Sequence, residues 1–346
     1  MLAPYGARAR EHAEGAIDLS VGTPVDSTPD FIQEALRQSA NAPGYPLTIG
    51  SPALRNAMRD WAINILGVRG EFDVLPSIGS KEVIANLPAT LKAKTVLYPT
   101  IAYPTYLVGA ILAGAEHHPV GFSSSDWPES DLVWINSPSN PTGRVAPIGE
   151  LEAVLAYSRR TGAVIASDEC YFNFPARQDG VKPLSILSVA EGDNQNLLAF
   201  HSLSKRSNLA GYRAGMIIGD PALIARVREI RKHTGLLVPT PVQAAMVAAL
   251  GDELHVEEQA LRYAARREVL RPALESIGFT IEHSEAGLYI WCTRGEEDYD
   301  SVSFLANMGI LTTPGSFYGK AGGHHIRIAL TATDTEISTA VARILA

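Results

Sequence analysis

Short apolar runs alternate with helix-like segments through the middle of the chain, and this alternation constrains the fold more than any other feature. The runs lie at residues 95–98, 132–135, 163–166, 197–200 and 214–218. Each is short, and β-branched or aromatic enough to form a buried strand. Between them, residues 148–160 have apolar side chains at helical spacing, and residues 221–233 open on a proline, as helices often do. This order predicts right-handed crossovers and an α/β fold with a mostly parallel central sheet flanked by helices.

The C-terminal third has a different pattern. A single long helix is expected from about residue 243 to residue 277, ended by Gly278. Strand-like segments and one helix follow it, at residues 280–283, 288–293, 301–308 (the helix) and 325–329. This pattern predicts a smaller α+β lobe, and we expect the N-terminal segment to join it. The predicted division is a large domain of residues 30–245 and a small domain of residues 1–29 and 246–346.

Composition excludes several classes of protein. Of 346 residues, 46% are hydrophobic and 19% are charged, which excludes disorder and suits two lobes. The formal net charge is −8 and no run of lysine and arginine occurs, which disfavours nucleic-acid binding. We find no secretory signal, and no stretch approaches the roughly 18 uncharged apolar residues of a membrane span. Two cysteines, Cys170 and Cys292, exclude a disulfide framework, so we expect a cytoplasmic enzyme.

Polar side chains follow three of the expected strands. Asn140 lies in an Asn-Pro-Thr-Gly segment after the second run. Asp168 and Tyr171 follow the third run, and Lys205 follows the fourth. Taken singly, a turn, a helix cap and a solvated lysine would explain them. Because ligands bind beyond the carboxyl ends of strands in open α/β sheets, their joint occurrence predicts one site.

Groups suited to a phosphate surround the lysine. Ser202 shortly precedes Lys205, and Arg213 follows it and can make bidentate, charge-assisted contacts. Ser80 and Lys81 open an apolar helix, whose free N–H groups can bind an anion. A phosphate site, a lysine amine and a carboxylate are what pyridoxal 5′-phosphate needs. In that hypothesis the lysine bonds the cofactor covalently, the aspartate keeps the pyridine nitrogen protonated, and the asparagine and tyrosine after the neighbouring strands bind the ring hydroxyl.

With these residues assembled, the chain resembles the class I/II aminotransferases, which are pyridoxal-phosphate enzymes of fold type I. The likeness runs over nearly the whole chain. Its motifs are Tyr45 to Arg55 (Tyr-Pro-Leu-Thr-Ile-Gly-Ser-Pro-Ala-Leu-Arg), Tyr103-Pro104-Thr105-Tyr106, Asn140-Pro141-Thr142-Gly143, Asp168-Glu169-Cys170-Tyr171, the segment around Lys205, and His325-Ile326-Arg327-Ile328-Ala329.

The resemblance implies a role for each cofactor-site residue. Lys205 holds the cofactor and moves the proton, Asp168 pairs with the ring nitrogen, and Tyr103 stacks on the ring face. Tyr171 and Asn140 bind the ring oxygen. The phosphate is surrounded by Ser80, Lys81, Ser202 and Arg213.

The resemblance also implies a substrate pocket and a partner. Arg327 matches the arginine that binds the α-carboxylate of small amino-acid and keto-acid substrates, and Gly22 lines the same pocket together with Asn140. Tyr45 matches a tyrosine that reaches the phosphate of the neighbouring subunit, which implies a homodimer with shared active sites. The partner of a second substrate carboxylate is not identified by sequence, although Lys81, Arg144 and Tyr318 lie beside site motifs.

Within this family, the chain is most similar to the actinobacterial succinyldiaminopimelate aminotransferases of lysine biosynthesis, through residues 18–26, 201–215 and 329–334. This likeness implies amino transfer between glutamate/2-oxoglutarate and N-succinyl-2-amino-6-oxopimelate. Three alternatives stay open: an aminotransferase for aspartate or another amino acid, a pyridoxal-phosphate-dependent β-lyase on the same scaffold, and a cofactor-sensing module. No metal site is expected, because the histidine pairs at 117–118 and 324–325 lack ligands at suitable spacing.

Overall fold

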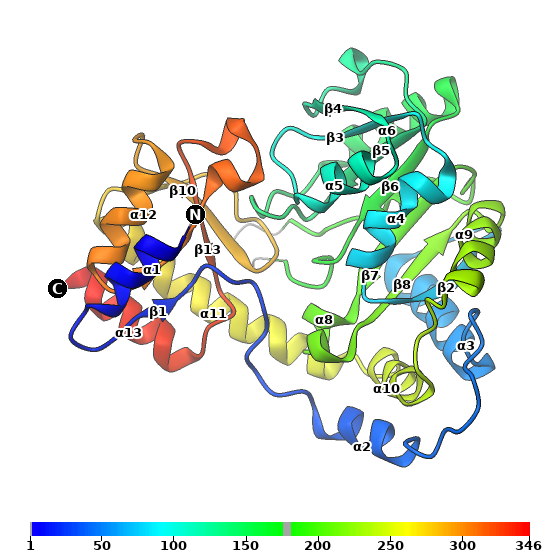
Figure 1. The fold of residues 1–346 in the computed structure, drawn as a ribbon, viewed down its shortest axis with the longest axis horizontal. Coiled ribbons are helices and arrows are strands. Elements are labelled where there is room, and N and C mark those ends of the chain that lie inside the picture. Colours follow the sequence, from blue (N-terminus) through cyan, green and yellow to red (C-terminus); the bar gives the residue numbers. More distant parts are fainter. Residues whose placement is uncertain (1, 176–180) are drawn as a thin grey trace.

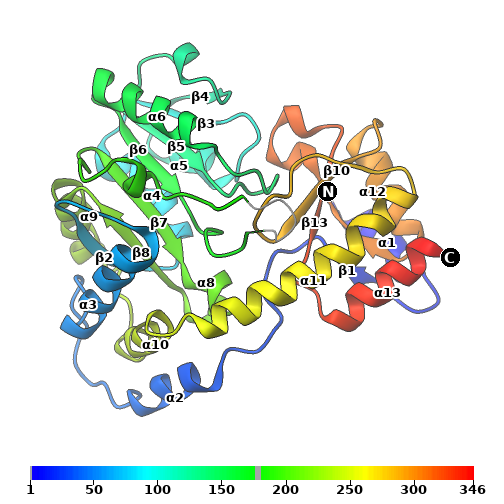
Figure 2. The same ribbon diagram turned by 180° about the vertical axis from the view of Figure 1, so that it is seen from behind.

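The computed structural model describes residues 2–175 and 181–346 of the chain. Two lobes lie side by side, a larger one built on the middle of the sequence and a smaller one built mainly on its last third (Figure 1). The view from behind shows helix α11 (Leu254–Ser276) extending from one lobe to the other (Figure 2). The domain boundaries expected from the sequence stay a prediction. No helix among the described residues is long and apolar enough to cross a membrane.

The large lobe is built on a sheet that has seven strands within the described residues, in the order β2-β8-β7-β6-β5-β3-β4. The strands are β2 (Asp73–Ile78), β3 (Thr95–Pro99), β4 (Glu116–Val120), β5 (Leu132–Asn136), β6 (Val164–Asp168), β7 (Leu197–Ser202) and β8 (Ala214–Gly219). Neighbours from β7 to β4 pair in parallel, which confirms the predicted mostly parallel sheet. β8 runs antiparallel to β7, because residues 203–213 are too few for the crossover that a parallel pair requires. It also pairs antiparallel with β2.

The two edge strands of this sheet, β2 and β4, are not among the apolar runs identified in the sequence. β2 contains Pro76, and β4 has the polar sequence Glu-His-His-Pro-Val with Pro119. A proline cannot donate to a ladder and is confined to sheet edges, which is where both strands lie. Charged residues and prolines at an edge also oppose pairing with a second molecule. The prolines and polar residues that made these two strands hard to predict are therefore typical of strands at the edge of a sheet.

Helices cover both faces of the sheet. One face packs against α4 (Lys81–Leu91), α5 (Thr105–Leu112) and α9 (Pro221–Thr234). The other packs with α2 (Asp30–Gln38), α3 (Pro52–Trp61) and its continuation η1 (Ala62–Leu66), α6 (Ile148–Thr161), α7 (Ile186–Val189) and α10 (Thr240–Leu250). Side chains alternate between the two layers along each strand: Leu198 and Phe200 of β7 enter one core, and Leu197 and Ala199 enter the other.

The prediction of one long helix over residues 243–277 is wrong in one respect, because the structure has two helices there. α10 ends at Leu250 and α11 begins at Leu254, with Gly251 as the C-cap of the first. Glycine lowers helix stability, and the Asp252 carboxylate accepts a hydrogen bond from the His255 N–H at 3.0 Å, which satisfies a free donor at the start of α11. The chain therefore turns between the helices.

The small lobe contains a second, antiparallel sheet. Its strands are ordered β12-β13-β10-β9, with bounds β9 (Thr280–Ile281), β10 (Tyr289–Thr293), β12 (Thr313–Pro314) and β13 (Ile326–Ala329). The helices around it are α1 (Ala3–Arg10), α11, α12 (Asp298–Asn307) and α13 (Asp334–Leu345). From the start of the chain, β1 (Ile17–Asp18) pairs in parallel with β11 (Ile310–Leu311), beside this sheet.

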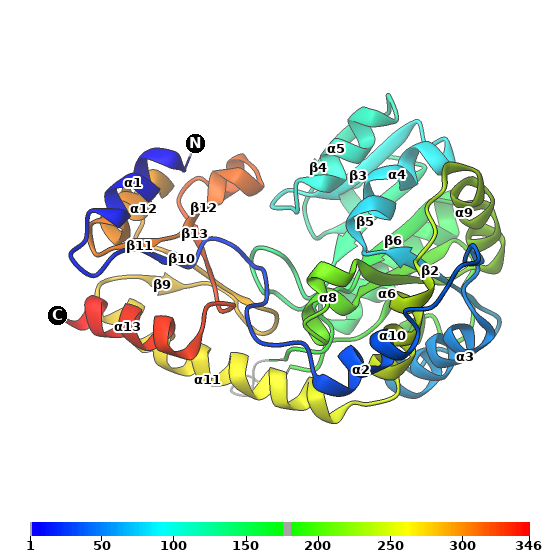
Figure 3. The same ribbon diagram turned by 60° about the horizontal axis from the view of Figure 1, so that its bottom comes forward.

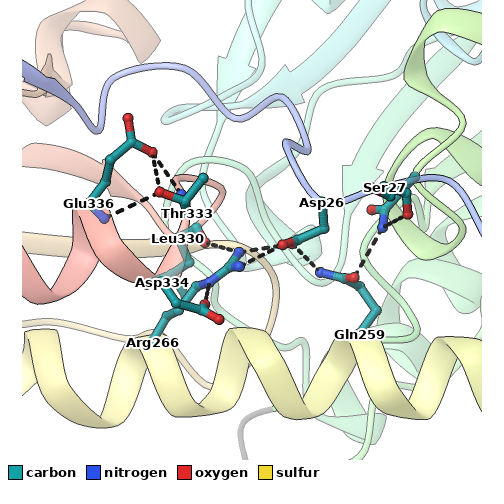
Figure 4. A network of polar contacts seen from close by, with 9 residues as sticks. Asp26, Ser27, Gln259, Arg266, Leu330, Thr333, Asp334 and Glu336 are labelled. Atoms are coloured by element: carbon teal, nitrogen blue, oxygen red, sulfur yellow. Dashed lines mark hydrogen bonds and ion pairs between the residues drawn. The ribbon is translucent and has the colours of Figure 1, made fainter.

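Residues 19–29, which we call the crossing segment, run from the small lobe toward the large lobe, while α11 lies beneath both (Figure 3). Arg266 of α11 donates to both carboxylate oxygens of Asp26, at 2.7 and 3.0 Å, and Gln259 donates to the same carboxylate at 2.7 Å (Figure 4). Asn208 of the large lobe donates to Gln259 at 3.0 Å. This partly buried network therefore anchors the crossing segment to both lobes.

Candidate active site

A cavity of about 600 Å³ lies where the two lobes meet at the carboxyl ends of β5, β6 and β7. Its walls include every residue predicted for the cofactor or the substrate carboxylate except Tyr45. These are Gly22, Ser80, Lys81, Tyr103, Asn140, Asp168, Tyr171, Ser202, Lys205, Arg213 and Arg327. The structure therefore brings together side chains that are more than three hundred positions apart in the sequence.

Lys205 lies on α8 (Leu203–Arg206), a single helical turn that follows β7 directly. The Ser202 hydroxyl caps this turn by accepting a hydrogen bond from the Ser204 N–H at 3.2 Å. The Lys205 ammonium donates to the carbonyl oxygen of Gly22 in the crossing segment. Burial lowers the pKa of Lys205. A lysine of lowered pKa supplies more of the free amine that covalent catalysis and proton transfer require.

Asp168 ends β6 and is almost completely buried. Its carboxylate accepts hydrogen bonds from the Tyr106 hydroxyl at 2.7 Å and from the Cys170 N–H at 3.2 Å. Burial raises the pKa of Asp168, so the charged carboxylate gains from a neighbouring cation. A protonated ring nitrogen would supply that cation. Sequence reasoning missed Tyr106, whose ring stacks on Trp134 with centroids 5.0 Å apart and so fixes its hydroxyl beside the carboxylate.

Gly79, Ser80 and Arg213 form a cradle for an anion. Gly79 has φ +66°, and a Cβ there would lie 2.5 Å from the Arg213 guanidinium, so only glycine lets the arginine approach this turn. Ser80 is the N-cap of α4, whose first N–H groups lack helical partners. Arg213 is held by a hydrogen bond from its Nη1 to the Ala210 carbonyl at 2.9 Å. A guanidinium beside a helix N-terminus fits a phosphate group.

Arg327 projects from β13 into the same cavity and is buried. Its Nη1 donates to Asn140 Oδ1 at 3.0 Å and its Nη2 donates to the Ser20 carbonyl at 2.6 Å, while Nε has no partner among the described residues. Its guanidinium lies 4.1 Å from the centroid of the Tyr289 ring. No carboxylate in the described part of the chain forms an ion pair with Arg327. A buried cation without a counterion indicates a site for an anionic group of a ligand.

Asn140 and Tyr171 are placed to serve a cofactor ring from two strand ends. The Asn140 N–H donates to Asn136 Oδ1 at 2.7 Å, and because Asn140 Oδ1 accepts from Arg327, its amide nitrogen is left to donate. The Tyr171 hydroxyl lies 3.0 Å from that of Tyr289, and burial raises the pKa of Tyr171. Both groups can donate to a ring oxygen. Their roles there stay predictions.

Tyr289 is a second residue that sequence reasoning missed. It lies on β10 and contacts the crossing segment so closely that a Cβ on Gly22 would be 2.1 Å from its hydroxyl. Burial works to raise the pKa of Tyr289, but the positive charges of Arg327 and Lys205 outweigh burial and lower it. The only signal in the sequence is the spacing of Tyr289, which lies two residues before Trp291 and therefore on the same face of the strand. Trp291 pairs with Arg327 in the small sheet, so this face is the one that carries Arg327.

Of the remaining residues singled out in the sequence, Tyr45, Arg144 and Tyr318 do not line the cavity, whereas Lys81 does. Tyr45 lies between α2 and α3, is 98% exposed and does not line the cavity of this subunit. Arg144, a candidate for a second substrate carboxylate, is engaged by Glu150 in a bidentate pair, at 2.5 and 3.1 Å, and stacks on Phe122. It lines a neighbouring cavity of about 190 Å³ instead. The Tyr318 ring lies 5.0 Å from the guanidinium of Arg327, and Lys81 lines the main cavity.

Comparisons with known proteins agree with this geometry. The family model described as aminotransferase class I and II matches residues 14–344. The 4-dedimethylamino-4-oxo-anhydrotetracycline transaminase OxyQ of Streptomyces rimosus is 52% identical over 99% of this chain and 97% of its own length. The probable aminotransferase Rv1178 of Mycobacterium tuberculosis is 48% identical over 99% of this chain and 83% of its own.

A solved structure extends the comparison to the whole fold. The probable N-succinyldiaminopimelate aminotransferase of Thermus thermophilus superposes with a TM-score of 0.89 at 27% identity, covering 99% of this chain and 98% of that one. The family model spans nearly the whole sequence, and the relatives and the fold point the same way. The chain therefore belongs to the class I and II aminotransferases, a pyridoxal-phosphate-dependent family of fold type I.

Proposed function

We propose that this aminotransferase moves an amino group between glutamate/2-oxoglutarate and N-succinyl-2-amino-6-oxopimelate, a step of diaminopimelate and lysine biosynthesis. The observation that carries the amino-acid part is the buried Arg327, which forms no ion pair with a described residue and lines the same cavity as Lys205. The acceptor is supported by the named activity of the Thermus thermophilus structure. The motif likeness in residues 18–26 and 329–334 supports it independently.

The cavity residues can divide the work as follows. Lys205 and Asp168, at adjacent strand ends, would hold pyridoxal phosphate by its aldehyde and its ring nitrogen, with its phosphate between Ser80 and Arg213. When bound, the cofactor supplies an electron sink for the electron pair left at the substrate α-carbon.

The protein then binds, orients and moves a proton. Arg327 and Asn140 hold the α-carboxylate, which fixes the α-carbon over the cavity floor. The Lys205 amine, whose pKa is lowered by burial, takes the α-proton and returns it later in the reaction. Tyr103, which precedes α5 and lines the cavity, would stack on the face of the cofactor ring.

A polycyclic keto compound is a second candidate acceptor, and one observation favours it. The neighbouring cavity, which Arg144 lines, has aromatic walls formed by Phe122, Trp127 and Trp291. OxyQ, at 52% identity, is named for action on an anhydrotetracycline, a polycyclic compound. A flat keto substrate could place its rings between these aromatic walls.

The relatives' family is generally dimeric, and we propose a homodimer in which the exposed Tyr45 completes the partner's phosphate site. Neither cysteine forms a disulfide, which suits the cytoplasmic location that we propose.

A screen of amino donors against the purified enzyme tests the function. Each donor is mixed with the aldehyde-form enzyme and conversion to the amine form is followed by absorbance. We expect glutamate and N-succinyl-LL-2,6-diaminopimelate to convert the enzyme, and aspartate and phenylalanine to do so more slowly. A response to glutamate alone would remove the proposed acceptor and leave the aminotransferase. Release of pyruvate and ammonia from a β-substituted alanine would favour the lyase alternative.

A further inference from the structure

The proposed function assigns no role to Tyr289. Its hydroxyl is 3.0 Å from the Tyr171 hydroxyl, and its ring lies under the Arg327 guanidinium at 4.1 Å. The tyrosine rings meet edge to face, with centroids 5.6 Å apart. Tyr289 is 2% exposed and lines the cavity. It therefore touches both the group expected to bind the cofactor ring oxygen and the group expected to bind the substrate carboxylate.

The groups around Tyr289 come from five parts of the fold. Titratable or charged side chains face it from β13, α8, the turn after β6, α11 and η4 (Gly315–Tyr318): Arg327, Lys205, Tyr171, Cys170, Tyr263 and Tyr318. Only Arg327 and Lys205 among these are cationic. Positive charge beside a phenol strengthens its O–H as a donor. Either hydroxyl of the pair can be the donor, and when Tyr171 gives its hydrogen to the cofactor ring oxygen, its own oxygen is left to accept from Tyr289. In that arrangement the positive charges make Tyr289 the stronger donor while Arg327 has no anion bound.

We propose that Tyr289 is a positioning residue that links carboxylate binding at Arg327 to the hydrogen bond that Tyr171 gives the cofactor ring oxygen. This inference rests on the proposed roles of Tyr171 and Arg327. With Arg327 unneutralised, Tyr289 donates to Tyr171, which makes Tyr171 a stronger donor to the ring oxygen. A bound carboxylate neutralises Arg327 and weakens both hydrogen bonds. The ring oxygen then holds negative charge less well, and the proton affinity of the cofactor site rises when substrate is present.

Tyr318 provides a matched control within the same chain. Its ring also lies beside Arg327, at 5.0 Å, and it is buried. Its hydroxyl is near Thr313 rather than Tyr171. Replacing either tyrosine by phenylalanine keeps the ring and its packing, so only the hydroxyl is lost. Tyr289→Phe removes the proposed link, whereas Tyr318→Phe removes a hydroxyl that does not belong to it.

The test is a pH titration of the visible absorbance of the holoenzyme, with and without glutarate. This dicarboxylate lacks an amino group and so binds without reacting. In wild type and in Tyr318→Phe, we expect glutarate to raise the midpoint of the titration. In Tyr289→Phe, we expect the rise to fall below about half of the wild-type value, because what remains is the direct effect of charge and the path from Arg327 through Asn140. Linkage also requires that glutarate affinity, measured by calorimetry, depends less on pH in this variant.

An equal rise in Tyr289→Phe and wild type would overturn the proposal, as would a wild-type midpoint that glutarate does not move. A loss of the rise in both variants would overturn it too, because the effect would then not be specific to Tyr289. Failure of the aminotransferase itself looks different: glutamate would leave the absorbance unchanged at every pH. The two failures are therefore distinguished in one set of spectra.

Discussion

The two sides of the active-site cavity are built by different means. On the cofactor side, Asp168 and Lys205 follow strands that lie next to each other in one sheet, so main-chain hydrogen bonds fix their separation. On the substrate side, Gly22, Tyr289 and Arg327 come from the crossing segment and two strands of the small lobe. β10 and β13 pair in the small sheet, and side-chain contacts such as those of Arg327 with Asn140 and of Lys205 with Gly22 hold this group against the large lobe. The cofactor side is thus a product of local topology, and the substrate side is a product of how the lobes dock.

This difference predicts how a substitution on each side of the cavity affects the residues around it. Loss of a residue on the cofactor side should remove a chemical group and leave its neighbours in place, because the sheet positions them. Loss of a contact on the substrate side should displace other residues as well, since each contact there positions the next. Four variants, taken from the largest expected effect to the smallest, test this contrast.

Lys205→Ala should abolish transamination, lowering the rate by about 10⁴-fold or more, because both the covalent attachment and the proton carrier are lost. The absorbance of the attached cofactor should disappear, while urea unfolding stays close to wild type. Lys81→Ala, which removes the other lysine of the cavity, should keep that absorbance and bind cofactor less tightly. An attached cofactor in Lys205→Ala would contradict the assignment.

Arg327→Leu should act chiefly on substrate binding. Removing the buried cation should raise the KM for glutamate by roughly 100-fold or more, since a charge-assisted, buried contact to the carboxylate is lost. The absorbance of the resting enzyme should remain. Arg144→Leu serves as the control, because Arg144 is already paired with Glu150 outside the cavity, and it should leave the KM for glutamate near wild type. Equal effects of the two substitutions would mean that Arg327 is not the carboxylate site.

Asp26→Asn should loosen the crossing segment without touching the cofactor side. Asp26 accepts from Arg266, whose side chain is only 2% exposed, so the change should lower the free energy of unfolding by about 2 kcal/mol and raise the KM for glutamate. Asp334→Asn removes the other partner of Arg266, a carboxylate that is 75% exposed, and should cost less than about 1 kcal/mol. Urea unfolding of both variants measures the difference.

The ion pair between Asp26 and Arg266 also predicts how the free energy of unfolding changes with pH. Burial works to raise the pKa of Asp26, but hydrogen bonds from Arg266 and Gln259 outweigh it and hold the pKa below its usual 3.8. A carboxyl group with a lowered pKa in the folded state stabilises the protein above pH 3.8 and loses that contribution as the pH falls through the lowered value. The stability gap between wild type and Asp26→Asn should therefore close on acidification. A gap that widens in acid would contradict the ion pair.

Tyr45→Phe should have the smallest effect and concerns the partner subunit. Because Tyr45 is 98% exposed in a single subunit, the loss of its hydroxyl should not change stability. If it reaches the partner's phosphate site, cofactor affinity should fall by roughly tenfold, the worth of one hydrogen bond to a charged group. Fluorescence titration of the cofactor, with sedimentation to establish the dimer, checks this. Unchanged affinity in a proven dimer would remove Tyr45 from the site.

The residues of the cofactor side could be predicted from the sequence because the signals that identify them are local. Asn140, Asp168 and Lys205 each stand two to five residues after a buried apolar run, and parallel strands bring such positions to one edge. The same local method failed at β2 and β4, whose prolines belong to sheet edges, and at residues 251–253, where α10 and α11 divide. The prediction of a mostly parallel sheet left the direction of β8 open, because an apolar run by itself carries no direction and only the short connection of residues 203–213 indicates an antiparallel pair.

Strand ends, motif spacing and charge therefore determined the family, the cofactor and most of the residues that line the cavity. Tertiary structure alone decided that Tyr106 supports Asp168, that Tyr289 joins Tyr171 to Arg327, and that Arg144 is already engaged by Glu150. Each of these depends on where a side chain meets another from a distant segment. Sequence periodicity records which face a residue takes, whereas packing between elements decides what that face meets.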